Sequence, residues 1–327
     1  MLEVILSKVM LERSLEKPSK LETTFDQFQV EIEGDLTMRC NYSCSYCESY
    51  DNSSTTQFKH LTEYLDAIDY LKNYFGNKTA KVDILGGEPM LFKDWNLVLN
   101  KIHDVGYLPK ITTNLSVTER SLNHKLEKLS PKNCIDVSWH MQFADDDKML
   151  KNIDIIKESG HLRSISILGD KRYWNRVLQA YESVKDTKVA EIAFIKDESA
   201  GKNAIANKLI NYSDDESKII SSSKIKESYF FKTTAEYTDQ KKYLTSINDF
   251  FTQGITNFKG MNCYVGENRI HIKQNGDVYP SACLLNYPRA KMGNIFKGRI
   301  KKPNRPIVCP FNFCGCGPHL RITNTQV

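Results

Sequence analysis

Apolar and polar residues follow two alternating patterns over the first two thirds of the chain. Short runs rich in β-branched and apolar residues predict six strands, at 28–37, 81–85, 109–113, 134–139, 163–168 and 190–195. Helical spacing of apolar residues appears between them, most clearly at Leu61, Tyr64, Leu65, Ile68 and Leu71. Further helical patterns lie near 94–105, 118–129, 145–159 and 172–184, and Gly106 and Gly160 follow two of them as stop signals.

Strand–helix repeats of this kind predict right-handed βαβ units and a parallel sheet. Six such units are fewer than the eight of a closed TIM barrel. We therefore expect an α/β fold with a partial (β/α)6 TIM-like barrel.

The pattern changes after the sixth predicted strand. Residues 197–226 are polar and rich in Ser, Lys and Asp, which predicts a helix followed by a mobile connection. A distinct module is evident from about 245, where two short strands flank Asn275–Gly276, a hairpin signal. We expect an N-terminal lead at 1–27, the barrel at 28–230 and a small C-terminal module of β-hairpin and cysteine-rich segments at 231–327.

Composition is that of an ordinary soluble globular protein, with 40% apolar and 26% charged residues in 327. The net charge of +5 permits an anionic partner without requiring one. The N-terminal stretch carries charges among its apolar residues and has no small-residue cleavage site, so it does not resemble a signal peptide. No apolar run is long enough for a membrane helix. We expect a cytoplasmic protein without a membrane partner.

Nine cysteines in such a chain require an explanation other than disulfides. Cys40, Cys44 and Cys47 lie directly after the first predicted strand, at the carboxyl edge of the sheet where ligands bind. Three thiolates favour an iron–sulfur centre or zinc, and three ligands leave one metal position open, which is typical of a reactive site. Zinc would require a further His or Cys, and 48–59 contains none. Cys134 stands alone in an apolar run and is expected to be a buried structural thiol.

The spacing Cys40-x3-Cys44-x2-Cys47, with Tyr46 before the last cysteine, resembles the signature of the radical SAM superfamily. The resemblance implies that the three thiolates hold a 4Fe–4S cluster and that S-adenosylmethionine binds its fourth iron. One electron then cleaves the sulfonium to a 5′-deoxyadenosyl radical, which abstracts a hydrogen atom from the substrate. It also implies an electron donor of the flavodoxin or ferredoxin type.

A second motif follows the second predicted strand. Gly86-Gly87-Glu88-Pro89 places glycines where a backbone approaches a ligand closely, and Glu88 is a possible acceptor for an ammonium group. The segment resembles the GGEP motif of the family, which implies that it holds the amino group of S-adenosylmethionine. Its alternative interpretation is a tight strand-to-helix turn, for which proline is suited.

Other strand ends supply weaker candidates. The resemblance implies cofactor contacts from Tyr46, Asn114 and Ser138, although an asparagine after a strand is commonly a turn residue. His140 is either a substrate-facing catalytic acid or base, or a polar residue satisfied within the protein. The family's glycine-and-glutamate pattern on the fifth strand has no clear match, since Gly169 is not accompanied by the matching acid. This leaves the adenine contacts other than Tyr46 open.

The second cysteine group is Cys263, Cys283, Cys309, Cys314 and Cys316. With the hairpin between the first two, it resembles the twitch and SPASM auxiliary-cluster modules. Five cysteines suffice for one fully ligated auxiliary 4Fe–4S cluster but not for two, which favours the smaller twitch form. Cys263 and Cys283 are the first expected ligands, and any pair of the other three completes the set. A structural zinc knuckle is the alternative.

Three classes of function remain open, led by redox modification of a peptide through a crosslink, thioether or epimerisation. The alternatives are a dehydrogenase or isomerase of a small molecule such as a sugar or nucleotide, and a modifier of nucleic acid. The short lead before the first strand disfavours a maturase with its own leader-binding domain. The basic segment 297–305 is capable of meeting phosphate but contains no aromatic residue for stacking, which favours a solvated loop. A non-enzymatic electron carrier would leave the GGEP segment unexplained.

Overall fold

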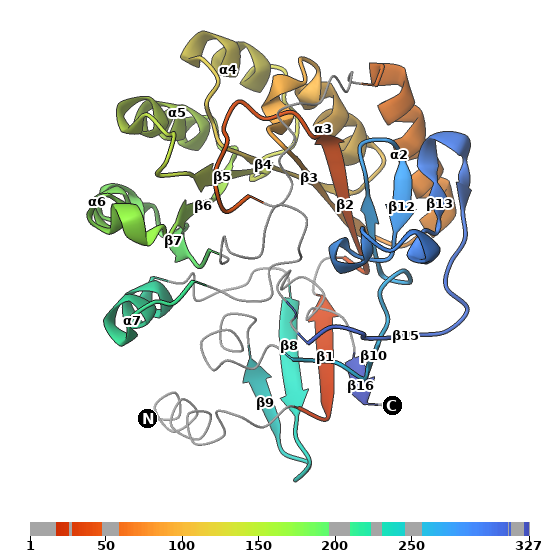
Figure 1. Ribbon diagram of the computed structural model, residues 1–327. Helices are drawn as coiled ribbons and strands as arrows, with labels where there is room; N and C mark the ends of the chain where they lie inside the picture. The colour runs from red at the N-terminus through yellow and green to blue at the C-terminus, as the bar shows by residue number, and fades with distance from the viewer. Residues whose placement is uncertain are drawn as a thin grey trace.

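The structure of the chain is a computed structural model that describes residues 18–25, 28–47, 59–195, 210–223, 231–245, 257–312, 314 and 324–326. Its strands form two sheets (Figure 1). The larger sheet has ten strands in the order β14-β13-β12-β11-β2-β3-β4-β5-β6-β7, and the smaller has six in the order β15-β10-β16-β1-β8-β9. Within the described residues, no helix is long and apolar enough to cross a membrane.

Six parallel strands, adjacent in chain order, form the predicted partial barrel. They are β2 (Val30–Thr37), β3 (Ala80–Gly86), β4 (Leu108–Thr113), β5 (Ile135–Trp139), β6 (Leu162–Leu168) and β7 (Ala190–Ala193). Six helices cover the outside of this sheet (Figure 1): α2 (Leu61–Phe75), α3 (Trp95–Asp104), α4 (Glu119–Leu126), α5 (Asp146–Glu158), α6 (Trp174–Val184) and α7 (Asp214–Ser222). The sheet does not close, so the prediction of an α/β partial barrel is confirmed.

Six short 3₁₀ helices complete the described connections. They are η1 (Pro89–Leu91), η2 (Lys171–Tyr173), η3 (Lys185–Thr187), η5 (Ala282–Leu284), η6 (Pro288–Ala290) and η7 (Ile295–Lys297). Gly106 and Gly160 adopt φ of 80° and 75° after α3 and α5, as expected for residues that end helices. In the polar segment 197–226, the described helix α7 lies near the end. The expected mobile connection falls mostly outside the described residues.

The alternation along each barrel strand separates two environments. On β2, Val30, Ile32 and Leu36 are buried in the core beneath the helices. Glu31, Glu33 and Asp35 occupy the alternate positions, which face the barrel interior because successive side chains point to opposite faces of a strand. The partial barrel therefore has an apolar outer face and a polar interior.

The C-terminal segment extends the barrel sheet. β11 (Arg269–Ile272) pairs in parallel with β2, and β12 (Asp277–Tyr279) returns antiparallel to β11, so the hairpin predicted at Asn275–Gly276 is present. Gly276 has φ of 84°, and a Cβ there would lie 2.3 Å from the Phe296 ring. β13 (Gly293–Asn294) and β14 (Arg299–Ile300) complete this edge.

The smaller sheet joins both ends of the chain. Its strands are β1 (Lys20–Phe25), β8 (Phe231–Glu236), β9 (Lys242–Thr245), β10 (Met261–Cys263), β15 (Ile307–Val308) and β16 (Asn324–Gln326). β1, which lies in the predicted N-terminal lead, pairs with β8 and β16. The predicted N-terminal lead therefore contributes a strand to the sheet that the C-terminal segment forms. The predicted domain boundaries at 27/28 and 230/231 stay a prediction.

Candidate active site at the carboxyl edge of the barrel

Cys40, Cys44 and Cys47 lie in the loop after β2. The loop is tight, since the Cys47 amide donates to the Cys44 carbonyl at 3.1 Å. Burial raises the pKa of the Cys44 thiol to about 12, and the Cys47 and Cys40 thiols add to the rise. The thiols are therefore within electrostatic reach of one another, as ligands of one cluster must be.

The three thiols do not converge on a point. Among the described residues, no three His, Cys, Asp or Glu side chains are placed to hold a single metal ion. A 4Fe–4S cluster presents separate irons at its corners, so its thiolate ligands stand apart. Three cysteine thiols in one loop are a donor set that such a cluster takes.

The glycines of the GGEP segment hold this loop in place. The Gly87 amide donates to the Thr37 carbonyl and the Glu88 amide to the Arg39 carbonyl, both at 2.7 Å. Gly86 has φ of 134°, and a Cβ on it would lie 2.0 Å from the Thr37 carbonyl oxygen. A Cβ on Gly87 would lie 2.2 Å from the Arg39 carbonyl oxygen. The close approach that requires glycine is thus made to the backbone that leads into Cys40.

The Glu88 carboxylate is buried at the centre of the site, with 1% of the residue exposed. Its Oε1 accepts from the Thr113 hydroxyl at 2.7 Å and the Met90 amide at 2.9 Å, and its Oε2 accepts from the Asn114 amide at 2.7 Å. Burial raises the pKa of Glu88 to about 7, against the lowering effect of these bonds. A carboxylate has about four acceptor positions, so about one remains on Oε2.

Both interpretations of the GGEP segment agree with this geometry. Glu88 caps η1, which begins at Pro89, so the segment is a strand-to-helix turn. The same carboxylate keeps an acceptor position for an ammonium group. Its role in cofactor binding stays a prediction.

Asn114 connects the end of β4 to the cysteine loop. Its Nδ2 donates to Asn41 Oδ1 at 3.0 Å and lies 3.9 Å from Cys40 Sγ. Its Oδ1 accepts from the Ser116 amide at 3.1 Å, which is the turn contact expected of an asparagine after a strand. The residue is therefore both a turn residue and a neighbour of the first cysteine.

His140 contacts the cysteine loop from the end of β5. Its Nδ1 lies 2.9 Å from the Tyr46 hydroxyl and 3.4 Å from Cys44 Sγ, and its ring stacks on Tyr46 at 5.9 Å between centroids. Burial lowers the pKa of His140 to about 4. Ser138, two residues earlier, is in register with Ser166 on the interior face, and its side chain forms no hydrogen bond with the described residues. The structure thus brings Tyr46 and His140 together, and the cofactor contact of Ser138 stays a prediction.

Three polar residues that the sequence analysis did not select hold Ser45, between Cys44 and Cys47. Gln142 accepts from the Ser45 amide at 3.0 Å and donates to its hydroxyl at 2.7 Å. Arg172 donates to the same hydroxyl at 2.9 Å, and Asp170 accepts from Gln142 at 3.0 Å and from Arg172 at 2.7 Å. Asp170 directly follows Gly169. An acidic residue next to this glycine at the end of a predicted strand was the signal from which Asp170 could have been selected.

Ion pairs cross the barrel interior from strand to strand. Lys81 contacts Glu31 at 2.7 Å and Asp83 at 3.1 Å. Lys110 lies 3.4 Å from Asp83 and 3.1 Å from Asp136. Farther along, Arg163 on β6 donates to Asp136 at 2.6 Å. The chain of pairs therefore runs from β2 to β6.

The same chain of pairs extends to β11. Arg269, which is fully buried, pairs with Glu31 and Glu33. His271 lies 3.2 Å from Glu33 and 3.0 Å from Asp35. Burial opposes protonation of His271, but the two carboxylates outweigh it and raise its pKa to about 9. The C-terminal segment thus supplies cations to an acidic strand of the barrel.

The late cysteines gather on and around β10. Cys263 and Cys283 both pack against Val265 and Leu284. Burial raises the pKa of Cys263 to about 12, with the nearby Cys309 thiol contributing to the rise. Cys314 is buried in an adjoining cluster with Met261, the first residue of β10. Which cysteines ligate a cluster stays a prediction, and Cys316 lies outside the described residues.

Cys134 has a different environment. It is fully buried, and its thiol donates to the Pro131 carbonyl at 3.3 Å. It is therefore a lone thiol in the core, as the sequence analysis expects.

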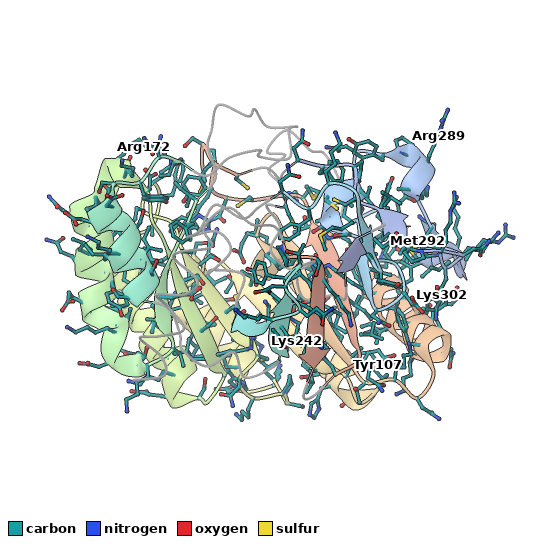
Figure 2. The ribbon with its side chains drawn as sticks, turned by 90° about the horizontal axis from the view of Figure 1, so that it is seen from below. Tyr107, Arg172, Lys242, Arg289, Met292 and Lys302 are labelled. Carbon is teal, nitrogen blue, oxygen red and sulfur yellow. The ribbon has the colours of Figure 1, made fainter. Side chains whose placement is uncertain are left out.

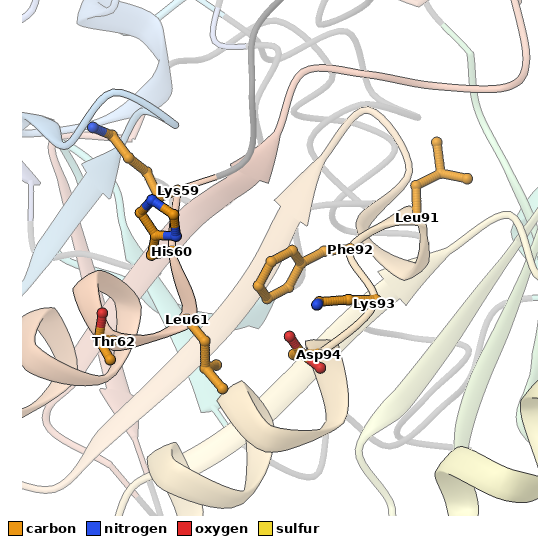
Figure 3. Close-up of a pocket in the computed structure, with 8 residues that line it drawn as sticks. All are labelled: Lys59, His60, Leu61, Thr62, Leu91, Phe92, Lys93 and Asp94. Atoms are coloured by element: carbon orange, nitrogen blue, oxygen red, sulfur yellow. The ribbon is translucent and has the colours of Figure 1, made fainter.

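A cavity of about 620 Å³ lies outside the barrel, beside the GGEP segment (Figure 3). Residues around the start of α2 and from the last residue of η1 onward line it: Lys59, His60, Leu61, Thr62, Leu91, Phe92, Lys93 and Asp94. None of the predicted cofactor residues lines this cavity, so it is separate from the site described above.

Comparison with known families identifies the barrel. Residues 35–196 match the Radical SAM superfamily. This range begins in β2 and ends just after β7, and it includes the cysteine loop, the GGEP segment and His140. The fold and the motifs therefore coincide in one segment.

Curated relatives match over parts of this range. An S-adenosylmethionine-dependent nucleotide dehydratase from Selenomonas ruminantium is 33% identical over 95 residues, 28% of this chain and 31% of the relative. A GTP 3′,8-cyclase from Campylobacter curvus is 24% identical over 151 residues, 46% of this chain and 41% of the relative. The chain spans less than half the length of the curated relatives it matches.

Solved structures resemble the fold over most of the chain. Streptococcus suis SuiB bound to the precursor peptide SuiA has a TM-score of 0.57 and 17% identity, covering 83% of this chain and 63% of that chain. Native anSMEcpe with bound AdoMet has a TM-score of 0.52 and 14% identity, covering 81% and 78%. At these identities the likeness concerns the fold.

Proposed function

We propose that the chain, whose residues 35–196 match the Radical SAM superfamily, is an enzyme that cleaves S-adenosylmethionine reductively. It uses the resulting 5′-deoxyadenosyl radical to abstract a hydrogen atom from its substrate. The observation that carries the proposal is the cysteine loop, whose backbone is bonded to the end of β3 through Gly87 and Glu88. Cys40, Cys44 and Cys47 would hold the 4Fe–4S cluster.

The surrounding residues bind and orient the cofactor in this proposal. Gly86 and Gly87 allow the strand end to lie against the loop, and Glu88 accepts the cofactor's ammonium group at its remaining acceptor position. Asn114 restrains the side of the loop that bears Cys40. Tyr46, held by stacking and by contact with His140, presents its ring to adenine.

His140 is a positioning residue in this scheme. Its Nδ1 already faces Tyr46 and Cys44, and its lowered pKa keeps the imidazole neutral at pH 7. These contacts support a role in ordering the loop over the alternative of a substrate-facing acid or base.

The proposed substrate is a peptide or another group without phosphate. The interior cations of the described strands are each paired with carboxylates: Lys81, Lys110, Arg163, Arg269 and His271. A nucleoside triphosphate whose phosphates were bound by these interior cations would have to break their buried pairs, and removing one partner of such a pair costs about 3–5 kcal/mol. This cost favours the redox modification of a peptide.

A nucleotide substrate is the second candidate. Relatives matched over the barrel are a GTP 3′,8-cyclase and a nucleotide dehydratase. Turnover assays with GTP and other nucleoside triphosphates distinguish the two candidates. A cyclised or dehydrated product would establish the nucleotide, and no product together with activity on a peptide would exclude it.

The cofactor proposal is tested on anaerobically reconstituted protein. We expect bound iron and sulfide, and formation of 5′-deoxyadenosine when dithionite is added. Replacing Cys40, Cys44 and Cys47 together by Ala should abolish this product. Cys134→Ala, which removes the lone core thiol, is the matched control and should retain it. Unimpaired cleavage by the triple variant would contradict the assignment.

Cys263 and Cys283, with two of the remaining late cysteines, would hold an auxiliary 4Fe–4S cluster, which would supply an electron acceptor near the substrate. The triple variant at Cys40, Cys44 and Cys47 should then retain about four irons per chain. Cys263→Ala in that background should remove them. Zinc in place of iron would identify a structural knuckle instead.

A further inference from the structure

Positive charge is concentrated in the C-terminal segment. Residues 257–312 contain ten Lys and Arg but only two Asp and Glu. The rest of the chain has 35 Lys and Arg against 38 Asp and Glu. The excess of cations that makes the chain basic therefore lies in this one segment.

Most of these cations are on the surface. The exposed ones after the hairpin are Arg289, Lys291, Lys297, Arg299, Lys301, Lys302 and Arg305. Lys291 pairs with Asp277 at 2.7 Å, and Lys302 lies over the Tyr74 ring at 5.4 Å. Arg289, Lys301 and Arg305 have no ion-pair partner among the described residues. Figure 2 shows Arg289 and Lys302 on the same flank of the molecule.

The exposed cations lie close to the late cysteines along the chain. Arg289 follows Cys283 by six residues, and Arg305 precedes Cys309 by four. Two exposed apolar residues lie between them and the cysteines. Tyr287 is 46% exposed and contacts the Phe311 ring, and Val308 is 52% exposed. We refer to Tyr287, Arg289, Lys301, Arg305 and Val308 as the basic face.

Ala290 and Ile307, the neighbours of Arg289 and Val308 in the chain, pack on the same cluster as Cys263 and Cys283, and the Lys301 amide donates to the Met292 carbonyl. Exposed apolar residues near unpaired cations are expected at the surface of a transient complex that forms by electrostatic steering. Complexes of electron-transfer proteins are of this kind, with small interfaces. Single-stranded nucleic acid would instead need several aromatic side chains for base stacking. Among the described residues of 257–312, Tyr287 is the one exposed aromatic side chain. The position beside the cysteine group favours an electron carrier.

We propose that the basic face is the docking surface for an acidic one-electron carrier protein of the flavodoxin or ferredoxin type, which rests on the proposed function above. The reduced carrier loses one electron and the enzyme gains it. That electron reduces the sulfonium of S-adenosylmethionine, whose bond to C5′ breaks to give methionine and the 5′-deoxyadenosyl radical. The basic face brings the two proteins together and takes no part in bond breaking.

The test reverses charge on the face and compares it with an equal change elsewhere. The variant is Arg289→Glu/Lys301→Glu/Arg305→Glu, which leaves the paired Lys291 and the packed Lys302 intact. The control is Arg120→Glu/Lys151→Glu/Lys157→Glu, on exposed positions of α4 and α5 with the same change of net charge. Iron content and circular dichroism establish that both are folded. Should the first variant fail this check, Arg289→Gln/Lys301→Gln/Arg305→Gln replaces it.

Binding of an oxidised, acidic flavodoxin to the reconstituted enzyme is measured by calorimetry at low and high salt. Charge reversal on the basic face should weaken binding by about tenfold or more, since charges at such an interface govern association. The control should bind within about twofold of wild type, and added salt should weaken binding of the wild type. Equal affinities for the variant and the control would overturn the proposal.

The reductant separates this proposal from the cofactor assignment. With reduced flavodoxin, the basic-face variant should form 5′-deoxyadenosine more slowly than the control. With dithionite, which needs no docking surface, the two should be equal. Absence of cleavage by the wild type with dithionite would refute the proposed function itself. If the variant loses binding of a single-stranded RNA oligonucleotide but binds flavodoxin normally, the face is a nucleic-acid site and the docking proposal is wrong.

Discussion

Glu88 combines a structural role with a proposed role in cofactor binding. Its carboxylate accepts from Thr113, Met90 and Asn114, so it joins the ends of β3 and β4 to η1. A buried carboxylate with a raised pKa gains from a nearby cation, because an opposite charge favours the ionised form. The ammonium group of S-adenosylmethionine, bound at the remaining acceptor position, would supply this cation. The residue is thus suited to both bracing and binding.

Two substitutions separate these roles. Glu88→Gln keeps the size of the side chain but removes its charge, and Thr113→Val removes one donor while keeping the carboxylate. If Glu88 binds the ammonium, Glu88→Gln should weaken S-adenosylmethionine binding by about 1.5–3 kcal/mol, the range for a hydrogen bond to a charged group. Thr113→Val should mainly lower stability. Equilibrium binding and thermal unfolding of the reconstituted variants measure both effects. If Glu88→Gln binds S-adenosylmethionine as tightly as wild type, the role of Glu88 is structural only.

At the scale of elements, the end of β3 fixes the course of the cysteine loop. The contact is between two backbones, at Thr37 and Arg39 on one side and Gly86 and Gly87 on the other. Backbone atoms do not yield as side chains do, so the site depends on the absence of side-chain atoms at these glycines. The loop geometry is therefore a property of the strand pair β2–β3.

Gly87→Ala tests this dependence. The new Cβ would meet the Arg39 carbonyl oxygen at 2.2 Å, so the backbone before Cys40 must move. We expect loss of bound iron from the first cluster and a lower melting temperature. Gly34→Ala is the matched control on the neighbouring strand, since nothing lies within 4 Å of its Cβ. Iron analysis after reconstitution compares them, and full iron content in Gly87→Ala would show that the contact is dispensable.

The same elements show what the sequence could predict. Periodicity identified β2 to β7 because each strand alternates with an amphipathic helix nearby in the chain. The spacing of the cysteines and the glycines identified the loop and the strand end. β1 was missed, since its partner β8 lies some two hundred residues away in the chain. The local β8–β9 pair was missed as well. The partners of Glu31 and Glu33 on β11 were unpredictable for the same reason.

At the scale of the whole molecule, ion pairs hold the C-terminal segment against the barrel. Arg269 and His271 on β11 face Glu31, Glu33 and Asp35 on β2 in a parallel register. The β11–β2 seam therefore depends on charge in a buried setting, where losing one partner leaves the other uncompensated. Because β11 leads to the hairpin and to Cys283, the seam also sets where the late cysteines lie relative to the barrel.

His271 makes this seam sensitive to pH. Its folded pKa of about 9 lies above the value of about 6.5 for an unperturbed histidine, so the folded state holds the proton more tightly. The resulting stability is fully present below pH 6.5 and is lost as pH rises through 9. A shift of this size corresponds to about 3 kcal/mol. Glu33 and Asp35 on β2 supply the charges that raise the pKa of His271, and the adjacent Arg269 shares Glu33 with it.

We therefore expect the melting temperature of the reconstituted protein to fall between pH 6.5 and 9.5. His271→Gln should melt at a lower temperature than wild type at pH 6.5, because Glu33 and Asp35 lose their shared cation. The variant should lose less stability as the pH rises, so the melting temperatures of the two proteins should become similar at pH 9.5. His103→Gln, at an exposed position on α3, is the control and should follow the wild-type curve. Thiols that titrate in this range are common to all three proteins and cancel in the differences. If His271→Gln loses stability with pH as steeply as wild type, the imidazole carries no proton at the seam, and Arg269 alone supplies the positive charge there.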